Sequence, residues 1–178
     1  MSRTYRIKLG VEQVILHGNS LTLPVTLSHI LPEEDMKGLF RQQLASTGWT
    51  SVDGEYLISI ENASSPAIRA VLNRDLDSLQ VSISERTVAV AEERLSAEQK
   101  ARAHRGETFD PDELSAITGP AGSEISQIIA SARGVLNKVL AVVYKEAVLQ
   151  KAQKLGVVES IEESESAQGT RVRITVNG

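Results

Sequence analysis

The chain has 178 residues, with 19 basic and 23 acidic side chains, a net charge of −4, 3% aromatic residues and no cysteine. The absence of cysteine excludes disulfides, thiolate zinc sites and cysteine nucleophiles. The acidic balance and the scarcity of aromatic side chains argue against nucleic-acid binding, which depends on a basic surface and on rings that stack with bases.

The N-terminal residues MSRTYRIKLG alternate polar and apolar side chains and contain no apolar core of a signal peptide. No run approaches the ~18 consecutive apolar residues of a membrane span. The sequence therefore predicts a cytoplasmic protein without a membrane span. Its length suits one large domain or two small lobes.

Alternation of apolar and polar residues predicts strands at the start of the chain, around Tyr5 to Leu9, Val14 to Leu16 and Leu21 to Leu27. The residues His17 to Ser20 are typical of a hairpin turn. Pro24 has no amide hydrogen to donate, so we expect its strand at a sheet edge or at a bulge.

A helix is predicted from about Pro32 to Thr47, with Pro32 at the first helical position and acidic residues in the first turn. Gly48 is the expected stop signal, and Trp49 is expected to cover Leu44 in a Schellman-type contact. Four apolar residues at helical spacing are expected to face the sheet: Met36, Leu39, Phe40 and Leu44.

Further strands follow the predicted helix, after a tight turn at Asp53-Gly54. The period-2 pattern places them at 56–60, 68–72, 79–83 and 88–90, with a loop at 62–66. Residues 1–91 are thus expected to form an antiparallel α+β lobe, in which one helix covers one face of the sheet.

Residues 92–122 are predicted to be a charged helical connector between two lobes. Ser96 and Gln99 form a capping-box pattern, which predicts a short helix over Ala97 to His104. Asp110-Pro111-Asp112-Glu113 repeats the pattern and predicts a second short helix that ends by Gly119-Pro120.

The third segment, 123–178, is predicted as one long helix followed by a C-terminal β-hairpin. Ser123 is the expected cap, and the helix runs to about Leu155, a span of roughly 50 Å. Its apolar positions recur every 3.5 residues. Such a stripe must bury itself on the first lobe, on a second copy or on another protein. We therefore predict these partner contacts: Trp49, Ile125, Ile129, Leu136, Val139 and Val143.

The predicted hairpin has arms at 157–161 and 170–176, and four glutamates crowd toward its turn at 167–169: Glu159, Glu162, Glu163 and Glu165. Their spacing is not that of an EF-hand loop, and nothing pairs them across a cleft as in a glycosidase. The sequence favours a solvated hairpin end with cross-strand Glu–Arg pairs.

No other pattern predicts a catalytic, cofactor-binding or metal-binding site. The histidines His17, His29 and His104 lack metal-ligand spacing. The residues Gly119 to Ser123 lack the lysine of a P-loop, and no G-x-S-x-G elbow is present. Acidic residues 33–35 are explained by the helix dipole. The chain is therefore predicted not to be an enzyme.

Three stretches together resemble the accessory proteins of bacterial FtsH ternary systems: MSRTYRIKL, ILPEEDMKGLFRQQLASTGW followed by DGEYLISI, and LNKVLAVVYKEAVLQKAQKLGVVESIEESESAQGTRVRITV. Those are small proteins encoded beside an FtsH-like ATPase. The resemblance implies a non-enzymatic partner of an AAA+ machine. Residues 96–122 show no match, and no functional residue is carried over.

Three functional hypotheses follow. The first is an accessory protein, an adaptor or subunit, that binds an FtsH-like AAA+ ATPase or a sister subunit in a bacterial multi-component system. The second is a self-assembling structural protein, a homo-oligomer whose seam is the helix 123–155. The third is a carboxylate-based hydrolase that uses Glu33, Asp35 or Glu163.

Overall fold

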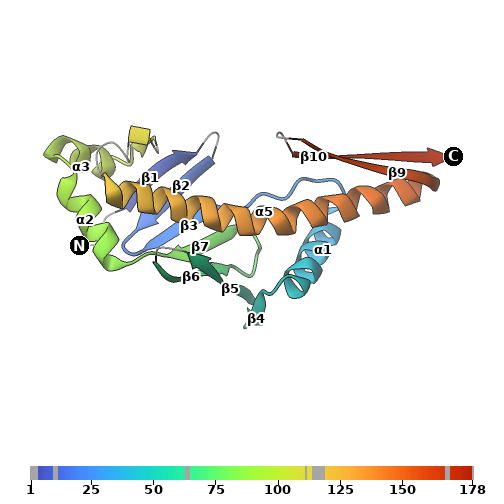
Figure 1. Ribbon diagram of the computed structural model, residues 1–178, viewed down its shortest axis with the longest axis horizontal. Helices are drawn as coiled ribbons and strands as arrows, with labels where there is room; N and C mark the ends of the chain where they lie inside the picture. Colours follow the sequence, from blue (N-terminus) through green and yellow to red (C-terminus); the bar gives the residue numbers. More distant parts are fainter. Residues whose placement is uncertain are drawn as a thin grey trace. The chain divides into compact units, whose positions relative to one another are not determined.

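The computed structural model describes residues 4–9, 12–62, 65–110, 112–113, 119–166 and 169–177, and it confirms the predicted α+β class (Figure 1). The chain forms two compact units. The first unit comprises Met1–Thr26 and Thr50–Val135, and the second comprises Leu27–Trp49 and Leu136–Gly178. The division into 1–91, 92–122 and 123–178 stays a prediction about domain organisation.

The first unit contains a sheet in which eight strands are described, in the order β4-β5-β6-β7-β3-β2-β1-β8. All neighbours are antiparallel except β1 and β8, which are parallel. The strands are β1 Thr4–Leu9, β2 Glu12–His17, β3 Ser20–Pro24, β4 Thr50–Val52, β5 Glu55–Asn62, β6 Ser65–Leu72, β7 Ser78–Ser82 and β8 Thr108–Phe109.

One face of this sheet is buried and the other is largely accessible. In the register of the central strands, Leu21 lies opposite Val81, and Leu23 lies opposite Leu79. These four side chains are buried, whereas Thr22 and its neighbour Gln80 are not. Alternation with a period of two therefore produces a one-sided sheet, as the sequence pattern predicts.

Two turn predictions at glycines are confirmed. Gly18 adopts a positive φ in the turn between β2 and β3. Asp53 and Gly54 have φ values of 51° and 86°, the left-handed pair of a type I′ hairpin between β4 and β5.

The expected position of Pro24 is wrong. Its strand, β3, lies inside the sheet between β2 and β7, and its pairing with β7 is regular. Pro24 is the last residue of β3, and the pairing with β2 already ends at Thr22. A proline is tolerated at a strand terminus because no ladder hydrogen bond is lost there.

The strand predicted at 88–90 is also wrong, because these residues belong to helix α2, Glu85–Arg94. The amide of Thr87 donates to the hydroxyl of Ser84 over 3.1 Å, so Ser84 caps the helix. Val88, Ala91 and Leu95 are buried at helical spacing. The short apolar run is compatible with the spacing of a strand and with that of a helix. The cap at Ser84 favours the helix.

The segment 92–122 contains the predicted helix α3, Ala97–His104. Both capping-box bonds are present: Gln99 N–H to Ser96 Oγ at 3.3 Å, and Ser96 N–H to Gln99 Oε1 at 2.8 Å. At the second predicted cap, Asp112 N–H donates to Asp110 Oδ1 over 2.9 Å, and residues 112–113 are helical. Residues 111 and 114–118 lie outside the described residues.

Two further features of this region were not predicted. Strand β8 pairs with β1, so the segment contributes an edge strand to the sheet. Helix α5, Pro120–Leu155, begins three residues before the predicted cap, Ser123. Ser123 N–H donates to Gly119 O over 3.1 Å, so Pro120 occupies the first helical position. The predicted end of the helix at Leu155 is confirmed.

The second unit contains α1, Glu33–Ser46, together with the second half of α5. The four apolar residues of α1 are buried as predicted, although the sheet belongs to the other unit. Gly48 has a φ of 84°, and Trp49 N–H donates to Leu44 O over 3.3 Å. This hydrogen bond runs from the second residue after the helix cap to the third residue before the cap. It is the bond that characterises the Schellman motif, which the sequence predicts.

The predicted C-terminal hairpin is confirmed. Strands β9, Val157–Ser166, and β10, Gly169–Asn177, form a separate antiparallel sheet of two described strands. Glu162 lies opposite Arg173, and Ile161 lies opposite Ile174. A bulge interrupts the register between Thr175 and Val176.

Candidate interaction surface

The six side chains predicted to contact a partner are all buried in the chain itself. Each of these side chains exposes at most 5% of its surface; they are Trp49 and five residues of α5, namely Ile125, Ile129, Leu136, Val139 and Val143. The apolar stripe of α5 is therefore core in the folded chain. Contact between these side chains and a partner stays a prediction, and it would require the fold to open.

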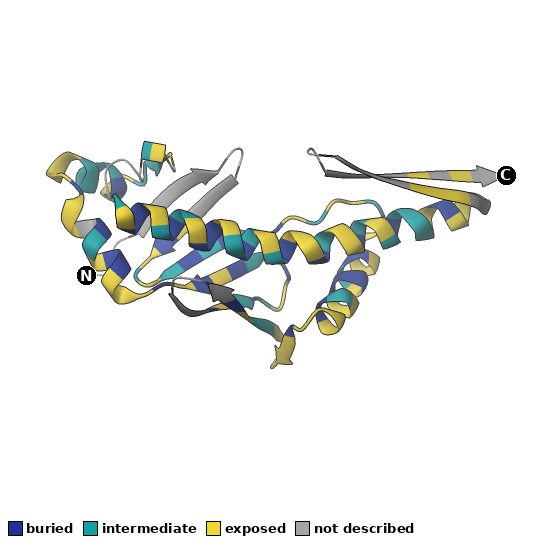
Figure 2. Ribbon diagram, viewed as in Figure 1, coloured by how far each residue is buried: buried dark blue, intermediate teal, exposed yellow. Residues whose placement is uncertain are grey.

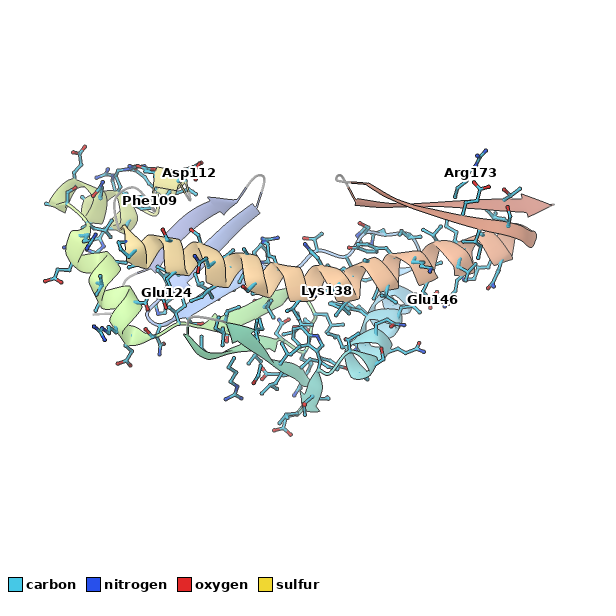
Figure 3. The ribbon with its side chains drawn as sticks, viewed as in Figure 1. Phe109, Asp112, Glu124, Lys138, Glu146 and Arg173 are labelled. Atoms are coloured by element: carbon cyan, nitrogen blue, oxygen red, sulfur yellow. The ribbon has the colours of Figure 1, made fainter. Side chains whose placement is uncertain are left out.

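The exposed residues of α5 occupy the opposite side of the helix, which we call the open side. Between Gln127 and Lys145 they are Gln127, Ala130 and Gly134 in the first unit, and Asn137, Lys138, Ala141, Val142 and Lys145 in the second. Figure 2 shows buried and exposed bands alternating along α5, and Figure 3 labels Lys138. Val142 is 43% exposed, the highest value for a large apolar residue between Pro120 and Gln150. Sequence reasoning missed this side because it followed the apolar spacing alone.

Gly134 stands on the open side without a packing reason inside the described chain. A Cβ atom added there would meet no heavy atom within 4 Å. Glycine in a helix interior costs roughly 0.5–1 kcal/mol relative to alanine. Its backbone is accessible, and the glycine weakens the helix.

A cluster of charged side chains surrounds Arg102 of α3. Arg102 Nε lies 3.0 Å from Glu107 Oε2, its Nη1 lies 2.5 Å from Glu113 Oε1, and Arg105 Nε lies 2.6 Å from Glu107 Oε1. The guanidinium of Arg102 also lies 4.8 Å from the ring centroid of Phe109 in β8 (Figure 3). The cluster thus ties α3 to the edge of the sheet.

These contacts keep both carboxylates of the Arg102 cluster charged. Hydrogen bonds from Arg105 and Arg102 lower the pKa of Glu107, and the hydrogen bond from Arg102 lowers the pKa of Glu113. A general acid needs the opposite, a raised pKa. The cluster is therefore suited to a structural role. A second contact suited to such a role joins buried Thr87 to α5, where Thr87 Oγ1 donates to Glu124 Oε2 over 3.0 Å.

Of the three carboxylates considered for a hydrolase, Glu33 and Asp35 have described side chains, and both lie in the first turn of α1. Glu33 forms an ion pair with Lys37 at 2.6 Å, and this hydrogen bond lowers the pKa of Glu33. Asp35 is exposed in the same turn, and the side chain of Glu163 lies outside the described residues. Within the described part of the chain, no group of three or more His, Asp or Glu side chains could hold a metal ion.

Helix α5 is long and apolar enough to cross a membrane by length and composition, a feature that the prediction of no membrane span did not anticipate. Only a third (33%) of its most apolar window of 18 residues is buried in the chain. One such helix is weak evidence for a membrane span, because core helices of water-soluble proteins satisfy the same criteria.

In a comparison with known families, residues 1–176 match the family described as FtsH ternary system domain X5. No curated protein and no solved structure matches the chain. The match spans both compact units and includes the segment 96–122, for which the sequence showed no resemblance. The chain therefore belongs to the family FtsH ternary system domain X5.

Proposed function

We propose that the chain is a non-enzymatic accessory protein that binds an FtsH-like AAA+ ATPase, or a sister subunit of the same bacterial system, in the cytoplasm. The observation that carries this proposal is the family match over residues 1–176, since the name of the family refers to an FtsH ternary system. The role of adaptor or subunit is the finer part of the proposal.

The chemistry of the described side chains supports a binding role. Carboxylate pKa values are lowered at Glu33 and around Arg102. In both places, hydrogen bonds from basic neighbours explain the lowering. The hydrolase hypothesis would need Glu33 to meet a second acid across a cleft, but Glu33 pairs with Lys37 instead. Self-assembly through the apolar seam of α5 is not proposed, because that seam is buried within the chain.

The test is co-purification of the tagged full chain from its native host, followed by mass spectrometry. We expect the FtsH-like ATPase or a sister protein to be recovered at a fixed ratio. A matched control is the variant Leu21→Asp, which places a charge in the buried face of the sheet and should unfold the first unit. Binding that depends on the folded chain is lost in this variant.

Repeated recovery of the chain alone, from cells that express the ATPase, would contradict the proposal. To test the hydrolase hypothesis, Glu33→Gln and Asp35→Asn are assayed beside the unmodified chain in a hydrolase screen. We expect no turnover in any of them. Turnover that these substitutions abolish, at an unchanged melting temperature, would favour the hydrolase.

A further inference from the structure

The hairpin of β9 and β10 lacks the strand neighbours that such a ribbon normally requires. The two strands have ten and nine residues, the longest among the described strands, and they pair with each other and with no other described strand. A two-stranded hairpin is marginally stable in water. Ile161 in β9 is 44% exposed, so apolar surface also remains uncovered.

No other described strand pairs with the outer edges of the ribbon. Each strand of a two-stranded sheet has one paired edge and one edge of free amide and carbonyl groups. Proteins usually protect such edges with charged side chains, lysine above all, and with proline, short strands or bulges. Neither strand contains proline or lysine, and the single bulge lies near the end of β10. The edges are therefore long and mostly regular.

The charges of the two strands identify what suits these edges. Strand β9 contains four glutamates and no basic residue, whereas β10 contains two arginines and no acidic residue. Within one chain, Glu162 lies opposite Arg173, and Arg173 Nη1 and Glu162 Oε2 form an ion pair at 3.9 Å, whereas Arg171 lies opposite Ser164. Opposite charges across strands are favourable, and like charges directly opposite are unfavourable.

We infer that the hairpin binds the hairpin of a second copy of this chain, with the outer edge of β9 against the outer edge of β10 of the next copy. Pairing β9 with β9 would bring two acidic strands together, with four glutamates in each copy, and pairing β10 with β10 would bring the arginines of two copies together. Only the mixed pairing places an acidic strand beside a basic one. The contact is head-to-tail, so it leads to a ring or to an open chain of copies.

The chain has no cysteine, so single cysteines report this contact directly. Ser160 in β9 and Thr175 in β10 are exposed and opposite each other in the hairpin. Protein carrying Ser160→Cys is mixed with protein carrying Thr175→Cys and treated with a short bismaleimide cross-linker, whose length tolerates a small register shift. We expect covalent dimers several-fold above the control mixture, in which Gln153→Cys of α5 replaces Ser160→Cys.

Each single-cysteine protein treated alone should give no more dimer than the control. Efficient cross-linking of Ser160→Cys to itself would mean that β9 meets β9, which overturns the inference. Circular dichroism of all three variants checks that each retains the fold of the unmodified chain.

Light scattering of the unmodified full chain provides the second readout. We expect the average mass to rise with concentration and to fall at about 1 M salt, where the screening length shrinks from about 8 Å to about 3 Å. A single-chain mass up to a few hundred micromolar overturns the inference, and so does association without hairpin cross-links. Neither of these two results bears on ATPase binding. Failure of the proposed function is detected separately, by co-purification.

Discussion

Single glycines of this chain have opposite roles, which their backbone angles distinguish. Gly134 lies on the open side of α5 with nothing within 4 Å of an added Cβ, whereas Gly48 ends α1 with a φ of 84°. An alanine at a helical position lowers the entropy of the unfolded chain, but at positive φ it is strained. From the sequence alone, a glycine that ends a helix can be recognised only where the helical pattern stops, as at Gly48.

We predict that Gly134→Ala raises the free energy of unfolding by roughly 0.5–1 kcal/mol, and that Gly48→Ala lowers it by roughly 1 kcal/mol. Urea denaturation followed by circular dichroism measures both. A destabilised Gly134→Ala protein would mean that some group approaches the helix closely at Gly134, contrary to the open space found there.

The Arg102 cluster predicts a pH dependence of stability. Because hydrogen bonds lower the pKa of Glu107 and Glu113 in the folded chain, the cluster stabilises it fully above the ordinary glutamate pKa of about 4.3. That contribution is lost as pH falls through the lowered values. We expect Arg102→Gln to lower the melting temperature at pH 7, and the difference from the unmodified chain to shrink between about pH 5 and pH 3.

The matched control for this pH series is Arg74→Gln. Arg74 Nη2 donates to the backbone carbonyl of Asp53 over 2.7 Å, and a carbonyl does not titrate in this range. Its effect on the melting temperature should therefore be constant from pH 7 to pH 3. If the Arg102→Gln difference in melting temperature is equally constant, the carboxylates contribute nothing to stability. Only the contact of Arg102 with Phe109 then matters.

At the scale of elements, helix ends were the most predictable features. The capping box of α3 and the Schellman motif of α1 follow from side chains within six residues of each other. The same local chemistry was overlooked at Ser84, where three apolar residues suggested a strand. Strand β8 has only two residues and depends on its pairing with distant β1, so no local pattern could have predicted it.

The capping box of α3 can be tested by a double-mutant cycle. Ser96→Ala and Gln99→Ala each remove one of the two reciprocal bonds, and each should cost on the order of 1 kcal/mol of stability. The double variant should cost less than the sum, because each bond helps to position the other. Strictly additive losses would show that the two bonds act independently.

The interaction surface was less predictable than the fold. Sequence spacing correctly identified the apolar stripe of α5, but it could not distinguish a stripe buried in its own chain from one offered to a partner. The structure buries Ile125, Leu136 and Val143, and leaves Lys138 and Val142 exposed. That distinction depends on which residues of the same chain cover the helix, and a periodic pattern carries no information about this.

At the scale of the whole molecule, the family match spans both compact units, so the full chain is the unit of function in our proposal. The described side chains provide paired charges and helix caps rather than poised acids or metal ligands. Under the proposed function, the activity of the chain is measured as binding to its partner.

The most direct test is a calorimetric titration of the full chain into a purified FtsH-like ATPase from the same host, with and without ATP. Our account predicts saturable binding with a fixed stoichiometry, which is lost when Leu21→Asp unfolds the chain. No heat of binding at concentrations up to about 100 micromolar, with either nucleotide state and with both proteins folded, would contradict it.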